Sequence, residues 1–178
     1  MTRPSYLGAI DALNILKDLS HFDPHVAGTP PLGLHTYKSD IDILCHSVSI
    51  DHFGEVLWAL YSGQAGFRVW QWASDGRPVV ARFTAHTWDF EIFGSAEPVE
   101  HQPGWQHFLV EHRLLALGGP SFRAKVMELR HAGLKTEPAF WWVLNKSGDP
   151  YSGMLSLIGW SDQAMAGLLQ NAGFNAPA

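Results

Sequence analysis

An Asp-x-Asp pattern within an apolar run is the feature that most constrains this chain. The run reads Ser39-Asp40-Ile41-Asp42-Ile43-Leu44. Because side chains alternate along a β-strand, Asp40 and Asp42 would share one face while Ile41 and Ile43 enter the core. Like charges on a shared face repel, and a divalent cation that takes oxygen ligands from both carboxylates offsets this repulsion. The alternative interpretation is a solvated strand end with two unrelated aspartates.

A Gly-Thr pair upstream favours the metal-site interpretation. Asp40 and Asp42 follow Gly28 by twelve and fourteen positions, and Thr29 comes directly after Gly28. Glycine lets the backbone approach a phosphate closely, and the Thr29 hydroxyl and nearby amides can donate to the phosphate oxygens. The two aspartates would then hold a metal that bridges the phosphates.

This order of motifs resembles the signature of the nucleotidyltransferase superfamily, which includes DNA polymerase beta and the antibiotic adenylyltransferases. The resemblance narrows to a smaller, uncharacterised bacterial group, domain of unknown function family 4269. The segments that carry it are Gly28-Thr29-Pro30 with Ser39-Asp40-Ile41-Asp42-Ile43, then Phe90-Glu91-Ile92-Phe93-Gly94, the spaced residues Pro98, Gln102, His107 and Glu111, and finally Gly133-Leu134-Lys135-Thr136-Glu137-Pro138-Ala139-Phe140 with Gly148-Asp149-Pro150-Tyr151.

The resemblance implies an α+β fold, with a nucleotidyltransferase-like mixed β-sheet, flanking helices and a helical C-terminal half. It also implies Mg²⁺ or Mn²⁺ as the metal, a nucleoside triphosphate as co-substrate, and Gly28, Thr29 and Ser39 as nucleotide-binding residues. The chain departs from the superfamily in one respect. Between the Gly-Thr pair and the first aspartate it carries only His35 and Lys38, and no arginine, where active transferases often have basic residues for the triphosphate.

The segment 67–93 predicts a β-meander that would supply a third carboxylate. Strands are expected at 67–72, 79–84 and 87–93, with a turn at 74–78. In the last strand the apolar residues share one face, so Asp89 and Glu91 point to the other. The superfamily needs a third acid on a neighbouring strand, and Glu91 is preferred because it sits in the family-like Phe90–Gly94 string. Asp89 is the secondary candidate, and two exposed acids on a half-buried sheet are the alternative.

The rest of the chain is predicted to contain two further strands and otherwise helices. Strands are predicted at 25–28 and 40–48, and helices at 5–19, 51–62, 100–117, 121–131, from 136, at 150–157 and at 161–171. We therefore expect a nucleotidyltransferase-like α/β core over 1–99 and a helical region over 100–178 that packs on it as one compact unit.

Four polar residues in apolar surroundings of the C-terminal half form a second tier of candidates. They are Gln102, His107, Glu111 and Lys135. Each could bind the nucleotide, and each could equally be a satisfied polar group that fixes helix packing. Lys135 is the strongest of them, because an ammonium just before a helix N-terminus is well placed to meet phosphate.

The amino-acid composition limits which classes of partner this chain can bind. At 178 residues and 46% hydrophobic content the chain can bury a full core, and a formal charge of −5 with pI near 6.0 makes nucleic acid an unlikely partner. No stretch is long enough to cross a bilayer, and the N-terminal residues lack the apolar run of a signal peptide, so a cytoplasmic location is expected. Histidine spacing supports no zinc site, and Cys45 is interpreted as a small buried hydrophobe. The oligomeric state is not indicated.

These patterns favour a metal-dependent nucleotidyltransferase that moves a nucleoside monophosphate to a hydroxyl of a small molecule or protein. Asp40 and Asp42 would bind the metals, and Glu91 would share one and act as general base. Gly28 and Thr29 would hold the β and γ phosphates, and the ammonium of residue 135 would neutralise the departing pyrophosphate. Two alternatives stay open: a catalytically degenerate fold that acts as a nucleotide- or partner-binding module, and a cleft recruited for other small-molecule chemistry.

Overall fold

The computed structural model describes residues 3–73 and 76–174 and divides the chain into two compact units. The first holds Met1–Pro31 and Lys38–Trp105, and the second holds Leu32–Tyr37 and Gln106–Ala178. The units divide after Trp105, and the segment Leu32–Tyr37, before the Asp-x-Asp run, belongs to the helical unit. The expectation that both parts form one compact unit stays a prediction.

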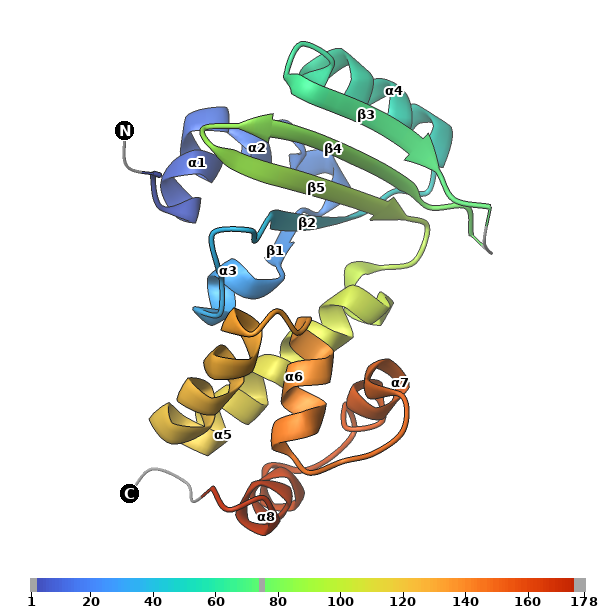
Figure 1. Cartoon of the computed structure of the whole chain (residues 1–178). Helices are drawn as coiled ribbons and strands as arrows, with labels where there is room; N and C mark the ends of the chain where they lie inside the picture. Colours follow the sequence, from blue (N-terminus) through green and yellow to red (C-terminus); the bar gives the residue numbers. More distant parts are fainter. Residues whose placement is uncertain (1–2, 74–75, 175–178) are drawn as a thin grey trace. The chain divides into compact units, whose positions relative to one another are not determined.

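A five-stranded mixed sheet, built within the described residues, forms the centre of the first unit (Figure 1). Its strands are β1 (His25–Ala27), β2 (Ile41–His46), β3 (Ala65–Gln71), β4 (Val79–Ala85) and β5 (Trp88–Ser95). They lie in the order β1-β2-β5-β4-β3, with β2 and β5 parallel and the other neighbours antiparallel. The predicted α+β class with a mixed sheet is confirmed. The expected turn at 74–78 lies partly outside the described residues.

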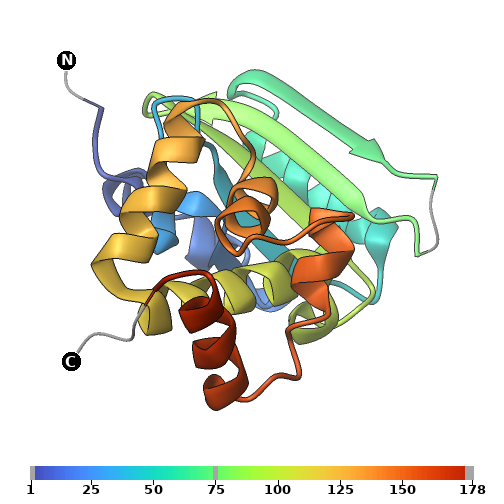
Figure 2. The same ribbon diagram turned by 60° about the horizontal axis from the view of Figure 1, so that its bottom comes forward.

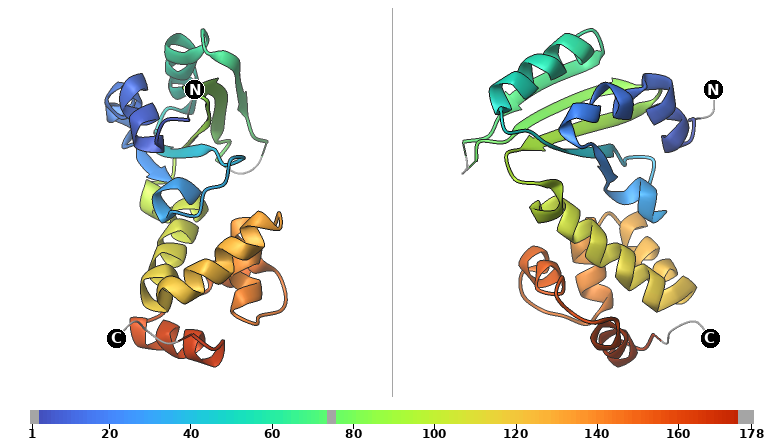
Figure 3. Two further views of the ribbon diagram at one scale, coloured as in Figure 1. Left: turned by 60° about the vertical axis from the view of Figure 1, so that its left-hand side comes forward. Right: turned by 180° about the vertical axis from the view of Figure 1, so that it is seen from behind.

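Helices cover one face of this sheet, as the rear view in Figure 3 shows. They are α1 (Tyr6–Leu13), α2 (Ile15–Asp18) and α4 (Ile50–Tyr61). Ile41, Ile43, Phe90 and Ile92 are fully or almost fully buried in the same apolar cluster as Phe53 of α4. This cluster is the core of the unit, so the acids that alternate with these residues lie on the opposite, open face.

Two local features of the first unit differ from the sequence-based expectation. The helix predicted over 5–19 is broken at Asn14, whose φ of 55° lies in the left-handed region. A short helix, α3 (Thr29–Leu32), follows Gly28 where a loop was implied. Its prolines, Pro30 and Pro31, fall in the first helical turn, where a missing backbone N–H costs no hydrogen bond.

The second unit is a helical cluster (Figure 2). It contains most of α5 (Pro103–His131), followed by α6 (Thr136–Val143), α7 (Pro150–Leu155) and α8 (Asp162–Asn171). The predicted break at Gly118-Gly119-Pro120 is present as a sharp kink inside α5, where Gly119 has φ 66° and ψ −164°. Among the described residues, no helix has both the length and the apolar character that crossing a bilayer requires.

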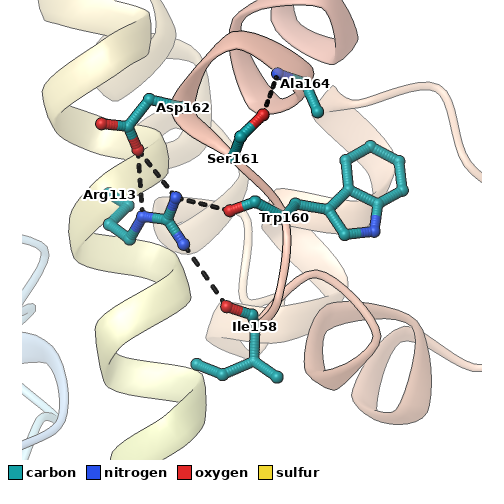
Figure 4. A network of polar contacts seen from close by, with 6 residues as sticks. All are labelled: Arg113, Ile158, Trp160, Ser161, Asp162 and Ala164. Carbon is teal, nitrogen blue, oxygen red and sulfur yellow. Dashed lines mark hydrogen bonds and ion pairs between the residues drawn. The ribbon is translucent and has the colours of Figure 1, made fainter.

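Arg113 ties the helices of the second unit together (Figure 4). Its guanidinium donates from Nη2 to the Trp160 carbonyl at 2.7 Å and to the Asp162 carboxylate at 2.7 Å. Nη1 reaches the Ile158 carbonyl at 3.5 Å. Because the planar fork can serve several acceptors at once, one side chain from α5 fixes the loop that leads into α8.

Candidate functional site

Asp42 and Glu91 are register partners across the parallel β2–β5 pair. Ile41 and Ile43, which flank Asp42, are fully buried, whereas Asp42 and Glu91 are partly exposed on the open face. Asp40 lies directly before β2 and is also partly exposed. The alternation predicted from the Asp-x-Asp run therefore places the acids away from the core. Register thus brings two acidic positions, from strands far apart in sequence, to neighbouring places on the sheet.

Gly28 packs against the Asp42 carboxylate. Its φ is +72°, in the left-handed region that favours glycine, and a Cβ built there would overlap Asp42 Oδ2. Register places Ala27, the last residue of β1, directly opposite Asp42. Glycine at position 28 therefore leaves the space that the Asp42 side chain occupies.

A buried hydroxyl pair joins the Gly-Thr segment to the Asp-x-Asp run. Thr29 Oγ1 donates to Ser39 Oγ at 3.0 Å, and the two residues are 8% and 6% exposed. Arg3 Nη2 donates to the Ser39 carbonyl at 2.9 Å. Arg3 also lies over the Trp88 ring, 3.4 Å from its centroid, and desolvation lowers the pKa of the guanidinium. These contacts fix the backbone immediately before Asp40.

Arg82 of β4 forms an ion pair with Glu91. Register places the two residues opposite each other, and both Nε and Nη2 of Arg82 bond to Glu91 Oε2. Partial burial by itself lowers the pKa of Arg82, but the bond to Glu91 and the charges of Glu91, Asp40 and Asp42 outweigh it and raise the pKa. The guanidinium of Arg82 thus interacts electrostatically with Asp40, Asp42 and Glu91, the three acids first assigned to the site.

Asp89, the secondary candidate, occupies a different place on the same face. Its carboxylate accepts a hydrogen bond from Thr84 Oγ1 at 2.6 Å, and its register partner is also Thr84. It lies two residues before Glu91 along β5, whereas Glu91 is level with Asp42. The register therefore favours Glu91 over Asp89 as the acid that works with Asp42.

The acids have the right chemistry for Mg²⁺ or Mn²⁺, because hard cations prefer carboxylate oxygens. In the described part of the chain, however, no three His, Cys, Asp or Glu side chains converge closely enough to hold a metal ion. Glu91 is instead paired with Arg82, a cation of the protein itself. Asp42 itself fills the space beside Gly28, so the described side chains as they stand do not form a metal site.

Gln102 has a structural role in this fold. Its Nε2 donates to the carbonyls of Cys45 and Glu97, each at 2.9 Å, and the residue is 2% exposed. The side-chain amide therefore clamps the end of β2 to the segment that leads into α5. Of the alternatives raised by the sequence, the packing role is the one these contacts support.

The other second-tier candidates belong to the second unit. His107 Nε2 lies 3.0 Å from the Tyr151 carbonyl and must carry the proton, because a carbonyl only accepts, while Nδ1 lies 3.7 Å from Glu137 Oε1. Glu111 is buried in α5. Lys135 is exposed and forms the N-cap of α6, which is the helix-terminal position expected. Nucleotide binding by these residues stays a prediction.

Burial settles the chemistry of Cys45. The thiol sits in the core and desolvation raises its pKa to about 12, so the reactive thiolate is suppressed at neutral pH. The interpretation of Cys45 as a small buried hydrophobe agrees with this environment.

Sequence analysis missed two arginines near the acids, Arg3 and Arg82. Basic residues for the triphosphate were expected only between Gly28 and Asp40. Arg82 could have been found by pairing the strands at 79–84 and 87–93 as a hairpin, because this places Arg82 opposite Glu91. Arg3 carries no local signal, since its contacts with Ser39 and Trp88 arise from residues far along the chain.

The fold is nucleotidyltransferase-like, as the comparison with solved structures of Cid1 shows. A structure of Cid1 concerned with its RNA terminal uridylyl transferase activity matches with a TM-score of 0.55 and 16% identity, over 78% of this chain and 45% of that chain. Cid1 poly(U) polymerase with MgGTP bound matches with a TM-score of 0.57 and 15% identity, over 84% of this chain and 47% of that chain. Cid1 in complex with its short product ApU matches with a TM-score of 0.52 and 17% identity, over 84% of this chain and 46% of that chain. The likeness concerns the fold, and this chain spans less than half the length of those proteins.

The chain belongs to the family described as Domain of unknown function (DUF4269), whose sequence profile matches residues 8–157. This confirms the family resemblance drawn from the motifs. No curated protein sequence matches the chain.

Proposed function

We propose that this protein is a metal-dependent nucleotidyltransferase that moves a nucleoside monophosphate from a nucleoside triphosphate to a hydroxyl of a small molecule or protein. The observation that carries the proposal is the pairing of Asp42 with Glu91 across β2 and β5, with Gly28 packed behind Asp42. The nucleotidyltransferase fold supports the same conclusion. The negative net charge of −5 favours a small acceptor over a nucleic acid.

Each residue has a distinct task in this proposal. Asp40 and Asp42 would hold the divalent cation, which when bound neutralises charge on the attacking and leaving oxygens. Glu91 would accept the proton of the acceptor hydroxyl as its oxygen bonds to the α-phosphorus and the bond to pyrophosphate breaks. The backbone at Gly28 and Thr29 would contact the β and γ phosphates, and the Thr29–Ser39 hydroxyl pair would keep that backbone in place.

One observation favours a second candidate, a nucleotide- or partner-binding module without transfer activity. Arg82 holds Glu91 in an ion pair, so the carboxylate that would act as general base is already bound to a cation of the protein. The segment after Thr29, Pro30-Pro31-Leu32, adds no basic side chain for a triphosphate.

Binding and transfer can be measured separately. Melting temperatures with each of the four ribonucleoside triphosphates, with and without Mg²⁺, test binding, because a ligand of the folded state raises the melting temperature. Incubation with α-³²P-labelled nucleotide, Mg²⁺ and a metabolite pool tests transfer, with Asp40→Ala/Asp42→Ala protein as control. We expect the nucleotide to raise the melting temperature only when Mg²⁺ is present. We also expect a labelled product with wild-type protein and none with the double variant. Stabilisation without any labelled product would favour the binding module, and identical behaviour of wild type and double variant would refute the metal site.

A further inference from the structure

Strand β3 forms an edge of the sheet, and its backbone can pair with a further strand. In the part of the chain that the structure describes, β3 is the last strand in the sheet and pairs only with β4. Gln71 lies opposite Val79, and the next residue, Trp72, donates its backbone N–H to the Pro78 carbonyl. Because hydrogen-bonded and non-hydrogen-bonded pairs alternate along an antiparallel ladder, the backbone N–H and C=O groups of Val69 and Gln71 point away from β4. An added strand would bond to these groups.

A groove lies between this edge and helix α4, which runs beside β3 (Figure 1). The groove has a volume of about 440 Å³. Its apolar lining comes from Ile50 and Trp58 of α4, Val69 of β3 and Val79 of β4. The side chain of Trp58 is 60% exposed, so a ligand in the groove could cover a large apolar surface there.

Two acids of α4 give the groove a negative charge. Asp51 and Glu55 lie four residues apart, about one helical turn, and both line the groove. Like charges at this spacing destabilise a helix, and a bound cation would offset their repulsion. Glu55 also lies 3.8 Å from His52, but both side chains are largely exposed, so this pair is weak and leaves Glu55 able to contact a ligand. The groove therefore favours a ligand that carries both apolar surface and positive charge.

Gly54 lies between these acids in α4, where helix packing does not require a glycine. A Cβ at this position would meet the methyl groups of Val79 at 4.0 Å, which is an ordinary van der Waals contact. Glycine inside a helix lowers helix stability relative to alanine. Gly54 and Val79 both line the groove, so a methyl group on residue 54 would narrow it. The glycine thus keeps the groove open while making the helix less stable.

We propose that the groove between α4 and β3 binds an extended basic segment of a partner protein, which adds a strand to β3. Backbone hydrogen bonds to Val69 and Gln71 would hold the segment in place. An arginine or lysine of the segment would lie with its aliphatic part over Val79 and its charged end at Asp51 and Glu55. The formal charge of −5 on the whole chain favours the approach of a basic partner. The groove shares no residue with the proposed nucleotide site, so this inference does not depend on the proposed function.

A synthetic peptide tests the proposal with the full chain. The probe is a capped, fluorescent heptapeptide with arginine at its centre, valine two residues away on either side and threonine at the other positions, so that arginine and both valines share one face of a strand. Fluorescence anisotropy measures its affinity. Asp51→Asn/Glu55→Gln should bind the probe about tenfold more weakly, because charge-assisted contacts are lost. Asp11→Asn/Glu97→Gln, which removes two exposed acids elsewhere, is the matched control and should bind it as wild type does.

Gly54→Ala should produce effects of opposite sign. The variant should melt at a higher temperature than wild type, because alanine favours the helix, and should bind the probe about fivefold more weakly, because the groove is narrower. Gly167→Ala in α8, where open space surrounds the added methyl group, should raise the melting temperature and leave probe binding unchanged. A Gly54→Ala protein that is more stable yet binds the probe as wild type does would remove the groove from the binding site.

Further peptides separate strand addition from other ways of filling the groove. A probe with glutamate in place of arginine, and a probe with a methyl group on every backbone nitrogen, should each bind at least about tenfold more weakly. Equal affinity of the methylated probe, or of butylguanidinium alone, would indicate a site for small cations and overturn strand addition. A dimer of the chain that the probe dissociates would mean that a second copy covers β3. The proposal is wrong if neither the arginine probe nor its lysine counterpart binds, and that result would leave the nucleotide experiments unaffected.

Discussion

Gly28 and Asp42 are packed so closely that the absence of a side chain on the glycine makes room for the aspartate carboxylate. The contact joins the turn after β1 to the middle of the open sheet face. The backbone conformation of Gly28 therefore affects where the Asp42 carboxylate lies.

Substituting this glycine should therefore affect both stability and metal binding. In Gly28→Ala, an L-residue at φ +72° costs about 1–2 kcal/mol, and displacement of Asp42 adds about 1–3 kcal/mol. Gly66→Ala is the matched control, because Gly66 has φ +67° and open space around the added methyl group. Urea unfolding and Mn²⁺ titration should show the larger stability loss and a weakened metal affinity only at Gly28. Equal losses for both variants would mean that the contact with Asp42 carries no weight.

The Gln102 clamp gives a prediction about stability alone. Gln102→Leu leaves the buried carbonyl of Cys45 and the partly buried carbonyl of Glu97 without this donor, which should lower the free energy of unfolding by about 1–3 kcal/mol. Gln170→Leu, at an exposed position of α8, should change it by less than about 0.5 kcal/mol. Chemical denaturation measures both. If Gln102 instead served the nucleotide, its loss would weaken nucleotide binding and spare stability.

Arg113 should stabilise the second unit mainly through its hydrogen bonds to backbone carbonyls, and less through its ion pair with Asp162. Arg113→Ala removes the bonds to Trp160 and Ile158 and should cost about 1–3 kcal/mol. Asp162→Ala removes only the ion pair, whose aspartate is 72% exposed, and should cost less than about 1 kcal/mol. Hydrogen exchange in α8 reports the local effect. A loss in Asp162→Ala as large as that in Arg113→Ala would contradict this ranking.

Cys45 should make the fold sensitive to alkali. Folding raises the pKa of this thiol from 9.0 to about 12, so above pH 9 the unfolded chain has lost a proton that the folded chain keeps. Stability is therefore fully present below pH 9 and falls as the pH rises toward 12, by about 2–3 kcal/mol at pH 11.

The check on this linkage is the pH dependence of urea unfolding in wild type and Cys45→Ala. The variant should lose less stability between pH 8 and pH 11, whatever its starting stability. Tyr61, whose pKa burial also raises, adds a loss of its own in both proteins, and the Cys45 thiolate contributes to that shift only in wild type. Parallel pH profiles would show that the thiol does not titrate on unfolding. Wild-type protein at neutral pH should also resist thiol reagents until it unfolds.

Much of the sheet could be predicted from the sequence because apolar and polar residues alternate along β5 from Trp88 to Ile92. The strands expected at 79–84 and 87–93 correspond to β4 and β5, and the buried Trp88, Phe90 and Ile92 fixed the outward face of Glu91. The break at Gly119 was also foreseen, since glycine followed by proline ends a regular helix. These signals are local, and each can be interpreted from a few neighbouring residues.

What the sequence did not predict depends on contacts between distant residues. The left-handed conformation of Asn14 divides a helix whose apolar spacing is continuous, and no local pattern marks it. The ion pair between Arg82 and Glu91 requires the register of a hairpin, and the contact of Arg3 with Ser39 requires the whole first unit to be folded. The acids of the site were therefore recognised, whereas the arginines that surround them were not.

The parallel pairing of β2 with β5 also sets an order of assembly. Arg82 and Glu91 belong to adjacent antiparallel strands and can meet as soon as that hairpin closes, whereas Asp42 lies forty-nine positions before Glu91 and joins through a long-range pairing. Pairings between distant segments form late, because the entropy of closing a long loop must be overcome first. We therefore expect the Arg82–Glu91 ion pair to form in the folding chain before Asp42 reaches its place beside Glu91.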